Sequence, residues 1–145
     1  QSNKEKYEPL KNVSFQKATV SESTDFANAS VVLLNLVLQF CSIKDRVGIL
    51  SKIYSDLCVG GALLLVEKTQ PSHPYIATSF RDSYYDFKKS QGYSHKEIDA
   101  KEKALHNVLM PLNFTENIQM MQSAGFQIIE PFYQWLNFCG WIAVK

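Results

Sequence analysis

Two almost wholly apolar runs flank an amphipathic segment, and this pattern limits what the chain can fold into more than any other feature. The runs are Val31–Leu34 and Ala62–Val66, and the segment between them is Ser42–Leu57, followed by Gly60-Gly61. Strands dispense with polar alternation where both faces of their sheet are covered, so the pattern predicts a parallel β-α-β unit. We expect this unit, from Ser30 to Lys68, to form the centre of an α/β sheet.

One polar residue, Asn35, follows the first apolar run and has apolar neighbours on both sides. In open α/β sheets, ligands bind outside the carboxyl ends of the strands, so Asn35 is the first candidate for a ligand contact. The alternative is that Asn35 only ends the strand. Glu67 and Lys68 end the second run on the same side of the sheet, and a solvated strand end is an equally good interpretation of that pair.

Further strands and helices are predicted around this unit. Apolar periodicity and turn residues indicate an exposed strand at Val13–Ala18, helices over Ser79–Gln91, Ser94–Leu109 and Thr115–Ala124, and strands at Phe126–Ile129 and Trp135–Val144. The last two strands are expected to form an antiparallel pair at a sheet edge. In the central helix, the residues expected to face the core are Val47, Leu50, Tyr54 and Leu57.

The helices between about residues 73 and 110 are more than one crossover connection needs. They predict an inserted helical layer that covers a substrate or forms a subunit interface, with simple packing as the alternative. With 145 residues, the chain is expected to form a single domain over 1–145.

Charge and cysteine content narrow the function classes. The formal net charge is +1, which gives no argument for nucleic-acid binding. The longest apolar run, Val31–Phe40, is far too short to span a membrane. The three cysteines form no C-x-x-C pair and the three histidines have no metal-ligand spacing, so we expect free thiols, a cytoplasmic protein and no metal site.

Four longer stretches carry a more specific signal. They read NASVVLLNLVLQF, KIYSDLCVGGALLLVEK, DFKKSQGYSHKEI and QWLNFCGWIAVK. Together they resemble the carboxy-S-adenosyl-L-methionine synthases, which are members of the class I S-adenosylmethionine-dependent methyltransferase superfamily. The resemblance runs from about Asn28 to Lys145.

The resemblance implies an α/β fold that is the C-terminal part of a class I methyltransferase sheet, mostly parallel with an antiparallel edge pair. It also implies a homodimeric transferase that converts S-adenosylmethionine and prephenate to carboxy-S-adenosylmethionine. The product would serve a partner enzyme that modifies the wobble uridine of tRNA. The cofactor would be S-adenosylmethionine or its carboxy derivative.

The resemblance also suggests site residues. The family asparagine that contacts the amino-acid part of the cofactor corresponds to Asn35. The family Asp-Ile pair beside the adenine corresponds to Val20-Ser21, which lacks the aspartate and leaves Ser21 as a weak candidate. The family arginine that grips the added carboxylate corresponds to Glu102, which would repel it unless a shift of one residue lets Lys101 or Lys103 replace it. Lys103 is therefore a second weak candidate, and no catalytic residue is assigned.

The family's glycine-rich cofactor loop has no counterpart in the chain, which contains no G-x-G-x-x-G. We therefore expect these residues alone to bind cofactor poorly and to be inactive. Two alternatives stay open: a methyltransferase of the same fold that uses unmodified S-adenosylmethionine, and a non-catalytic dimerisation or binding module that has lost ligand residues.

Overall fold

The fold is known from a computed structural model, which describes residues 12–21 and 24–145. Its elements follow the chain as strand β1 (Ala29–Asn35), the short 3-10 helix η1 (Leu38–Phe40), α2 (Ile43–Asp56), β2 (Leu57–Lys68), α3 (Pro74–Ser90), α4 (His95–Leu105), α5 (Phe114–Ser123), β3 (Ile128–Trp135) and β4 (Phe138–Val144). No helix in this part of the chain is long and apolar enough to cross a membrane.

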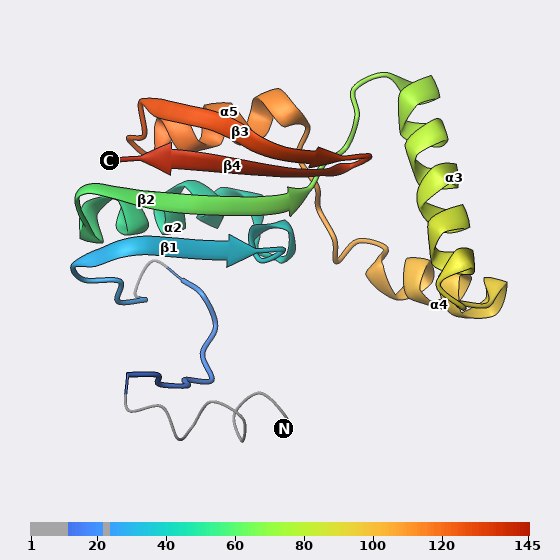
Figure 1. The fold of residues 1–145 in the computed structure, drawn as a ribbon, viewed down its shortest axis with the longest axis horizontal. Coiled ribbons are helices and arrows are strands. Elements are labelled where there is room, and N and C mark those ends of the chain that lie inside the picture. Colours follow the sequence, from blue (N-terminus) through green and yellow to red (C-terminus); the bar gives the residue numbers. More distant parts are fainter. Residues whose placement is uncertain (1–11, 22–23) are drawn as a thin grey trace.

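The sheet contains four strands in the order β1-β2-β4-β3 (Figure 1). β1 and β2 are parallel and are joined by α2, which confirms the predicted β-α-β unit. β4 runs antiparallel to both β2 and β3, which confirms the predicted antiparallel pair at the end of the chain. Within the described residues, therefore, one of the pairings is parallel and the others are antiparallel.

The core lies between the sheet and the two helices α2 and α5. Leu63 and Leu65 of β2, Trp141 of β4 and Phe126 are fully buried there. The predicted buried face of α2 is partly wrong, because Val47 is exposed, whereas Arg46, Ile49 and Ile53 point inward together with the predicted Leu50. The periodicity rule counts only apolar residues, and it therefore missed a buried arginine.

Two predictions of local structure are wrong for identifiable reasons. Val13–Ala18 is not a strand: its residues are exposed, and none of the described strands pairs with it. The first helix of the layer starts at Pro74 and not at Ser79. Pro74 suits the first turn of a helix, and the Nδ1 atom of His73 accepts the backbone N–H of Tyr75 at 3.2 Å.

The helices α3 and α4 lie beyond the carboxyl ends of β1 and β2, away from α2 and α5 (Figure 1). The sequence Ser94-His95-Lys96-Glu97 predicts a capping box at the start of α4. The box is present, since Ser94 and Glu97 exchange backbone-to-side-chain hydrogen bonds. α4 ends at Leu105, earlier than predicted, and Asn107 then adopts a left-handed conformation with φ of 61°. The chain then reaches α5 through an irregular segment at residues 109–113.

Candidate functional site

A buried carboxyl group organises the backbone directly after β1. Glu67, at the end of β2, is 3% exposed. One of its oxygens accepts the backbone N–H groups of Val37 and Leu38 at 3.1 and 2.9 Å, and the other accepts that of Gln39 at 2.9 Å. Burial raises the pKa of Glu67, and the three backbone donors and the nearby Arg46 oppose that rise. Glu67 thus holds the loop that follows Asn35.

Arg46 connects the same loop to the segment after α4. Its guanidinium is buried, and Nη2 donates to the backbone oxygens of Cys41 at 3.0 Å and Met110 at 2.7 Å. The backbone N–H of Met110 donates in turn to the oxygen of Gln39 at 2.9 Å. The side chain of Arg46 and this backbone hydrogen bond therefore hold the loop after β1 against the segment after α4.

Asn35 is exposed at the last position of β1, opposite Val66 of β2. The next residue, Leu36, has φ of 57°, and its N–H donates to the oxygen of Val66 at 2.7 Å. A left-handed conformation costs an ordinary residue roughly 1–2 kcal/mol. The surrounding hydrogen bonds must therefore hold Leu36 in this strained conformation. Strained backbone of this kind is common at binding sites.

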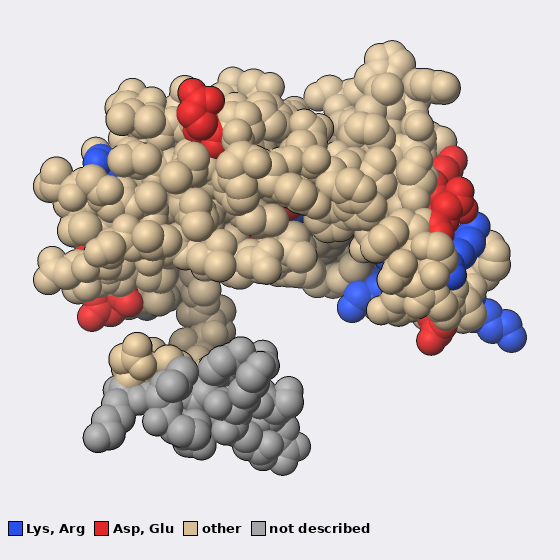
Figure 2. Space-filling view, in the orientation of Figure 1, with Lys and Arg blue, Asp and Glu red and all other residues tan. Residues whose placement is uncertain are grey.

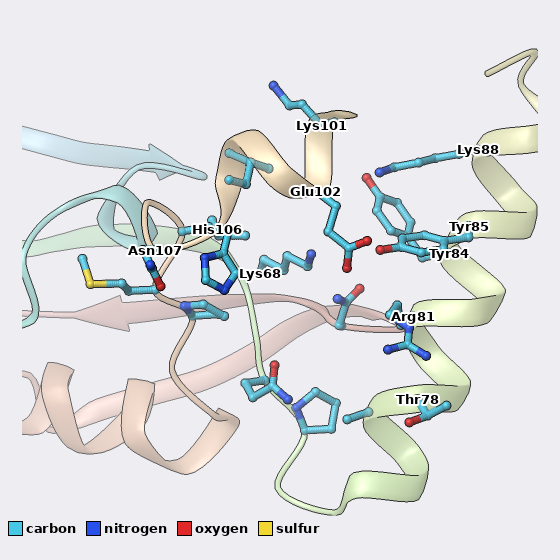
Figure 3. Close-up of a pocket in the computed structure, with 18 residues that line it drawn as sticks. Lys68, Thr78, Arg81, Tyr84, Tyr85, Lys88, Lys101, Glu102, His106 and Asn107 are labelled. Carbon is cyan, nitrogen blue, oxygen red and sulfur yellow. The ribbon is translucent and has the colours of Figure 1, made fainter. Parts of the chain in front are cut away.

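A cavity of about 540 Å³ lies where the end of β2 meets α3, α4 and the segment after α4 (Figure 3). Figure 3 shows Lys68 and Glu102 pointing into this cavity, with Tyr84, Tyr85 and Lys88 facing it from α3. Besides Tyr84 and Tyr85, the ionisable residues that line it are Lys68, Arg81, Lys88, Lys101, Glu102 and His106. Four cationic side chains against one carboxylate favour a small anionic ligand.

Two of the cationic side chains lie over aromatic rings. The Nζ atom of Lys88 lies 4.5 Å from the ring centroid of Tyr84, and that of Lys68 lies 5.8 Å from the same centroid. Burial lowers the pKa of Lys68, and the neighbouring charge of Lys88 adds to this effect. A bound anion would relieve the repulsion between the two lysines.

Glu102, which is predicted to correspond to the family arginine, belongs to the same cavity. Burial and a hydrogen bond with Glu102 raise the pKa of Tyr85 to about 12. The carboxylate of Glu102 is therefore partly engaged by a hydroxyl donor of this chain. This contact reduces the repulsion that Glu102 would exert on an anionic ligand.

Asn137 adds a polar group that has no partner. Its side chain lines the cavity and is 8% exposed, and its Oδ1 atom accepts no hydrogen bond from the residues that the structure describes. An unpaired buried acceptor costs about 1–3 kcal/mol. Because this atom is buried, the Asn137 side chain has to turn toward the cavity before a ligand there can donate a hydrogen bond to it. The cavity thus combines cations for an acidic group with an acceptor for a hydroxyl or amino group.

The sequence candidates are distributed over different parts of this end of the molecule. Ser21 lines a second cavity of about 550 Å³ together with Val20, Phe40 and Cys41. Lys103 borders a shallow hollow beside Asp99 and His106 and is outside the larger cavity. Asn35 lines neither the cavity at the end of β2 nor the one beside Ser21. Glu102, in contrast, is inside the cationic cavity.

Several residues of the site were not singled out from the sequence. Arg46, Arg81 and Asn137 carry no motif, and their positions depend on how distant segments meet. The placement of Glu67 and Lys68 at the ligand side of β2 was the one available signal. Across residues 12–21 and 24–145, no cluster of three histidine, cysteine or acidic side chains is placed to hold a metal ion.

Curated proteins that are similar to this chain in sequence include carboxy-S-adenosyl-L-methionine synthases. No protein-family model matches the chain. The carboxy-S-adenosyl-L-methionine synthase of Methylococcus capsulatus is 40% identical over 129 residues, which are 89% of this chain and 53% of that protein. The synthase of Helicobacter pylori strain HPAG1 is 38% identical over 141 residues, 97% of this chain and 59% of that protein. The chain thus spans a little over half the length of these curated relatives.

Solved structures agree on the fold. The S-adenosylmethionine-dependent methyltransferase SibL superposes with a TM-score of 0.64 at 13% identity, over 99% of this chain and 39% of that one. At such low identity the similarity concerns the fold alone. By sequence, therefore, this chain is similar to a little over half the length of the carboxy-S-adenosyl-L-methionine synthases, and its fold is that of the S-adenosylmethionine-dependent methyltransferases.

Proposed function

We propose that this chain is part of a transferase that converts S-adenosylmethionine and prephenate to carboxy-S-adenosylmethionine. The observation that carries the proposal is the cationic cavity at the carboxyl ends of the strands, in a chain 40% identical to a protein of that name. Prephenate is a dicarboxylate with a hydroxyl group. Its chemistry matches a cavity that offers several cations and one unpaired acceptor.

Each side chain of the cavity has a role in this proposal. Lys68, Lys88 and Arg81 bind and orient the carboxylates of the acidic substrate. The Oδ1 atom of Asn137 accepts a hydrogen bond from the substrate hydroxyl. Fixed charges in a half-buried cavity stabilise developing charge without reorganisation, so we infer catalysis by positioning and electrostatics.

The cofactor would be held by a different set of residues. Asn35, exposed at the end of β1, would contact the amino-acid part of S-adenosylmethionine, and the cavity beside Ser21 is large enough for a planar base. S-adenosylmethionine supplies the sulfonium centre at which the reaction occurs. The described residues fit only part of this cofactor, because they include no glycine-rich loop to bind its carboxylate.

The assembly and cellular role are inferred from the resemblance. We propose a homodimer, a cytoplasmic location, and a product that is used by a tRNA-modifying enzyme. The three free thiols suit a reducing compartment. The exposed aromatic residues Tyr75, Phe87 and Tyr93 on and after α3 would suit a subunit contact.

The test combines product formation with a matched pair of variants. The full-length protein of which this chain is a part is incubated with S-adenosylmethionine and prephenate, and carboxy-S-adenosylmethionine is measured by mass spectrometry. Lys88→Met is expected to raise the prephenate concentration needed for half-maximal rate at least about tenfold, because it removes one charged hydrogen bond. Lys89→Met is the control, since Lys89 pairs with Asp86 on the exposed side of α3. Absence of product and of any heat of binding with either cofactor would contradict the proposal.

A methyltransferase that uses S-adenosylmethionine directly is the second candidate. Glu102 favours it, because a carboxylate in the cavity opposes the extra carboxylate of the carboxy derivative. Calorimetric titration separates the two functions. If Glu102→Arg does not increase affinity for carboxy-S-adenosylmethionine relative to S-adenosylmethionine, Glu102 does not occupy the position of the family arginine.

A further inference from the structure

The two cavities at the carboxyl end of the sheet have walls that come from different parts of the chain. Phe40 and Cys41, directly after η1 begins and ends, border the cavity beside Ser21. Lys68, at the end of β2, and Met110, in the segment after α4, border the cationic cavity. No described residue lines both cavities. Any influence that a ligand in one cavity has on the wall of the other must therefore pass through the residues that join the two walls.

Arg46 is one such connection. Its guanidinium donates to the backbone oxygen of Cys41 from Nε at 3.1 Å and from Nη2 at 3.0 Å. The same Nη2 atom donates to the backbone oxygen of Met110 at 2.7 Å. Hydrogen bonds from a charged donor are stronger than those between neutral groups. Because Arg46 is buried, the two wall residues cannot move apart without breaking a strong hydrogen bond that water does not replace.

Gln39 is a second connection, and its side chain is buried as well. Its backbone oxygen accepts the N–H of Met110 at 2.9 Å, and its Oε1 atom accepts the N–H of Lys68 at 2.9 Å. The carboxyl group of Glu67 accepts the N–H of Gln39 at 2.9 Å and so fixes this residue in turn. The residue that directly precedes Phe40 therefore holds two wall residues of the cationic cavity.

The segment that Arg46 holds has little other support. α3 has no buried residue, and α4 has one, Ile98. Residues 106–108, which follow α4, are exposed. Figure 2 shows charged side chains of both signs gathered over this end of the molecule, as expected for helices that lie largely in solvent. Elements with few buried apolar contacts open locally at low free-energy cost, so the position of Met110 depends on Arg46 and Gln39.

We propose that Arg46 and Gln39 couple the two cavities, so that a ligand beside Ser21 increases the affinity of the cationic cavity for an acidic ligand. Neither residue lines either cavity, so both are positioning residues that act through the wall residues they hold. A ligand that orders the loop at Cys41 would also order Met110, and the second ligand would then lose less conformational entropy on binding. This inference rests on the proposed function, because it takes S-adenosylmethionine and prephenate as the two ligands.

The experiment measures binding to the full-length protein of which this chain is a part. Prephenate is titrated calorimetrically with and without saturating S-adenosylhomocysteine, which lacks the sulfonium centre and so cannot react. We expect S-adenosylhomocysteine to tighten prephenate binding at least about fivefold in the wild type. Binding linkage is reciprocal, so prephenate should tighten S-adenosylhomocysteine binding by the same factor.

Two variants of the connection should reduce this factor. Arg46→Lys keeps the charge beside Glu67 but replaces a planar fork by a single nitrogen, so it cannot hold Cys41 and Met110 in the same geometry. We expect the factor to fall below about twofold. Gln39→Met removes the acceptor for the N–H of Lys68 and should lower the factor as well.

Ile53→Val is the matched control. Ile53 is buried on the same helix as Arg46 and lines neither cavity, so this variant should lower the melting temperature and keep the coupling factor of the wild type. Hydrogen exchange gives a second readout. S-adenosylhomocysteine alone should slow exchange of the Met110 amide at least about threefold in the wild type and in Ile53→Val, and should not slow it in Arg46→Lys.

Two results would overturn the proposal. One is a wild type that binds both ligands but binds prephenate equally well with and without S-adenosylhomocysteine. The other is an equal loss of coupling in Arg46→Lys and Ile53→Val, which would make the role of Arg46 merely structural. Either result would leave the proposed function intact. Failure of the wild type to bind one of the two ligands would contradict the proposed function and this inference together.

Discussion

The carboxyl group of Glu67 accepts the backbone N–H of Leu38 at 2.9 Å, across 29 residues of sequence. This contact connects the end of β2 to the loop that follows Asn35. The same carboxyl group also holds the N–H groups of Val37 and Gln39. The geometry of the candidate cofactor residue thus depends on a side chain from the neighbouring strand.

Glu67→Gln tests this dependence. Glutamine keeps one oxygen for Val37 and Leu38 but presents an NH₂ group to the N–H of Gln39, which loses its acceptor. A buried donor without a partner costs about 1–3 kcal/mol, so the free energy of unfolding should fall by that amount. Urea unfolding followed by circular dichroism measures it. Glu130→Gln, on the exposed part of β3, is the control and should change stability by less than about 0.5 kcal/mol.

Gly125 and Gly92 make a second matched pair. Both have positive φ, 116° and 91°, so alanine is strained at either position. A Cβ atom at Gly125 would lie 2.9 Å from the Cδ1 atom of Tyr54, whereas nothing lies within 4 Å of one at Gly92. Gly125→Ala should therefore destabilise the protein by about 1–3 kcal/mol more than Gly92→Ala, because Tyr54 must move. If thermal unfolding shows that the two variants lose equal amounts of stability, the contact with Tyr54 has no effect on stability.

The parts of the fold that depend on local patterns were predictable from the sequence. Apolar runs and a Ser94–Glu97 capping box indicated the β-α-β unit and the start of α4, and both are present. The start of α5 at Phe114 was missed by one residue, because Asn113 and not a later residue forms the cap with Glu116. The alternation of apolar and polar residues in Val13–Ala18 wrongly indicated a strand, since a stable strand also requires a neighbouring strand.

The candidate site was less predictable, because its geometry depends on segments far apart in the chain. Nothing local distinguishes Arg46, which binds the oxygen of Met110 across 64 residues. Asn137 gains its importance only where the turn before β4 faces α4 across the cavity. Sequence position made Asn35 and Lys68 candidates, because ligands bind at the carboxyl ends of strands in α/β sheets. No comparable rule applies to the remaining residues of the site.

The contact between Tyr85 and Glu102 predicts an unusual titration. Because burial and the hydrogen bond with Glu102 raise the pKa of Tyr85 to about 12, Tyr85 should ionise after ordinary tyrosines. Glu102→Gln removes the negative charge and should lower this pKa towards 10. Near-ultraviolet absorbance of tyrosinate measures the change, with Tyr85→Phe to identify the signal. A late tyrosine that is unchanged in Glu102→Gln would contradict the contact.

Lys68 gives the stability of the protein a dependence on alkaline pH. Burial, aided by the charge of Lys88, lowers the pKa of Lys68 below its ordinary value of 10.5. Between the lowered pKa in the folded state and the ordinary pKa in the unfolded state, the unfolded chain binds more protons. The contribution of Lys68 to the free energy of unfolding therefore increases as pH rises through this window. Urea unfolding across the window should show an increase in wild type relative to Lys68→Met. Lys44→Met, at an exposed position of α2, is the control and should follow wild type.

A bound carboxylate should raise the pKa of Lys68 again, so prephenate binding in the same window should take up protons from the buffer. Calorimetry in buffers of different ionisation enthalpy detects that uptake, and an equal heat in all buffers would show that the anion does not bind beside Lys68.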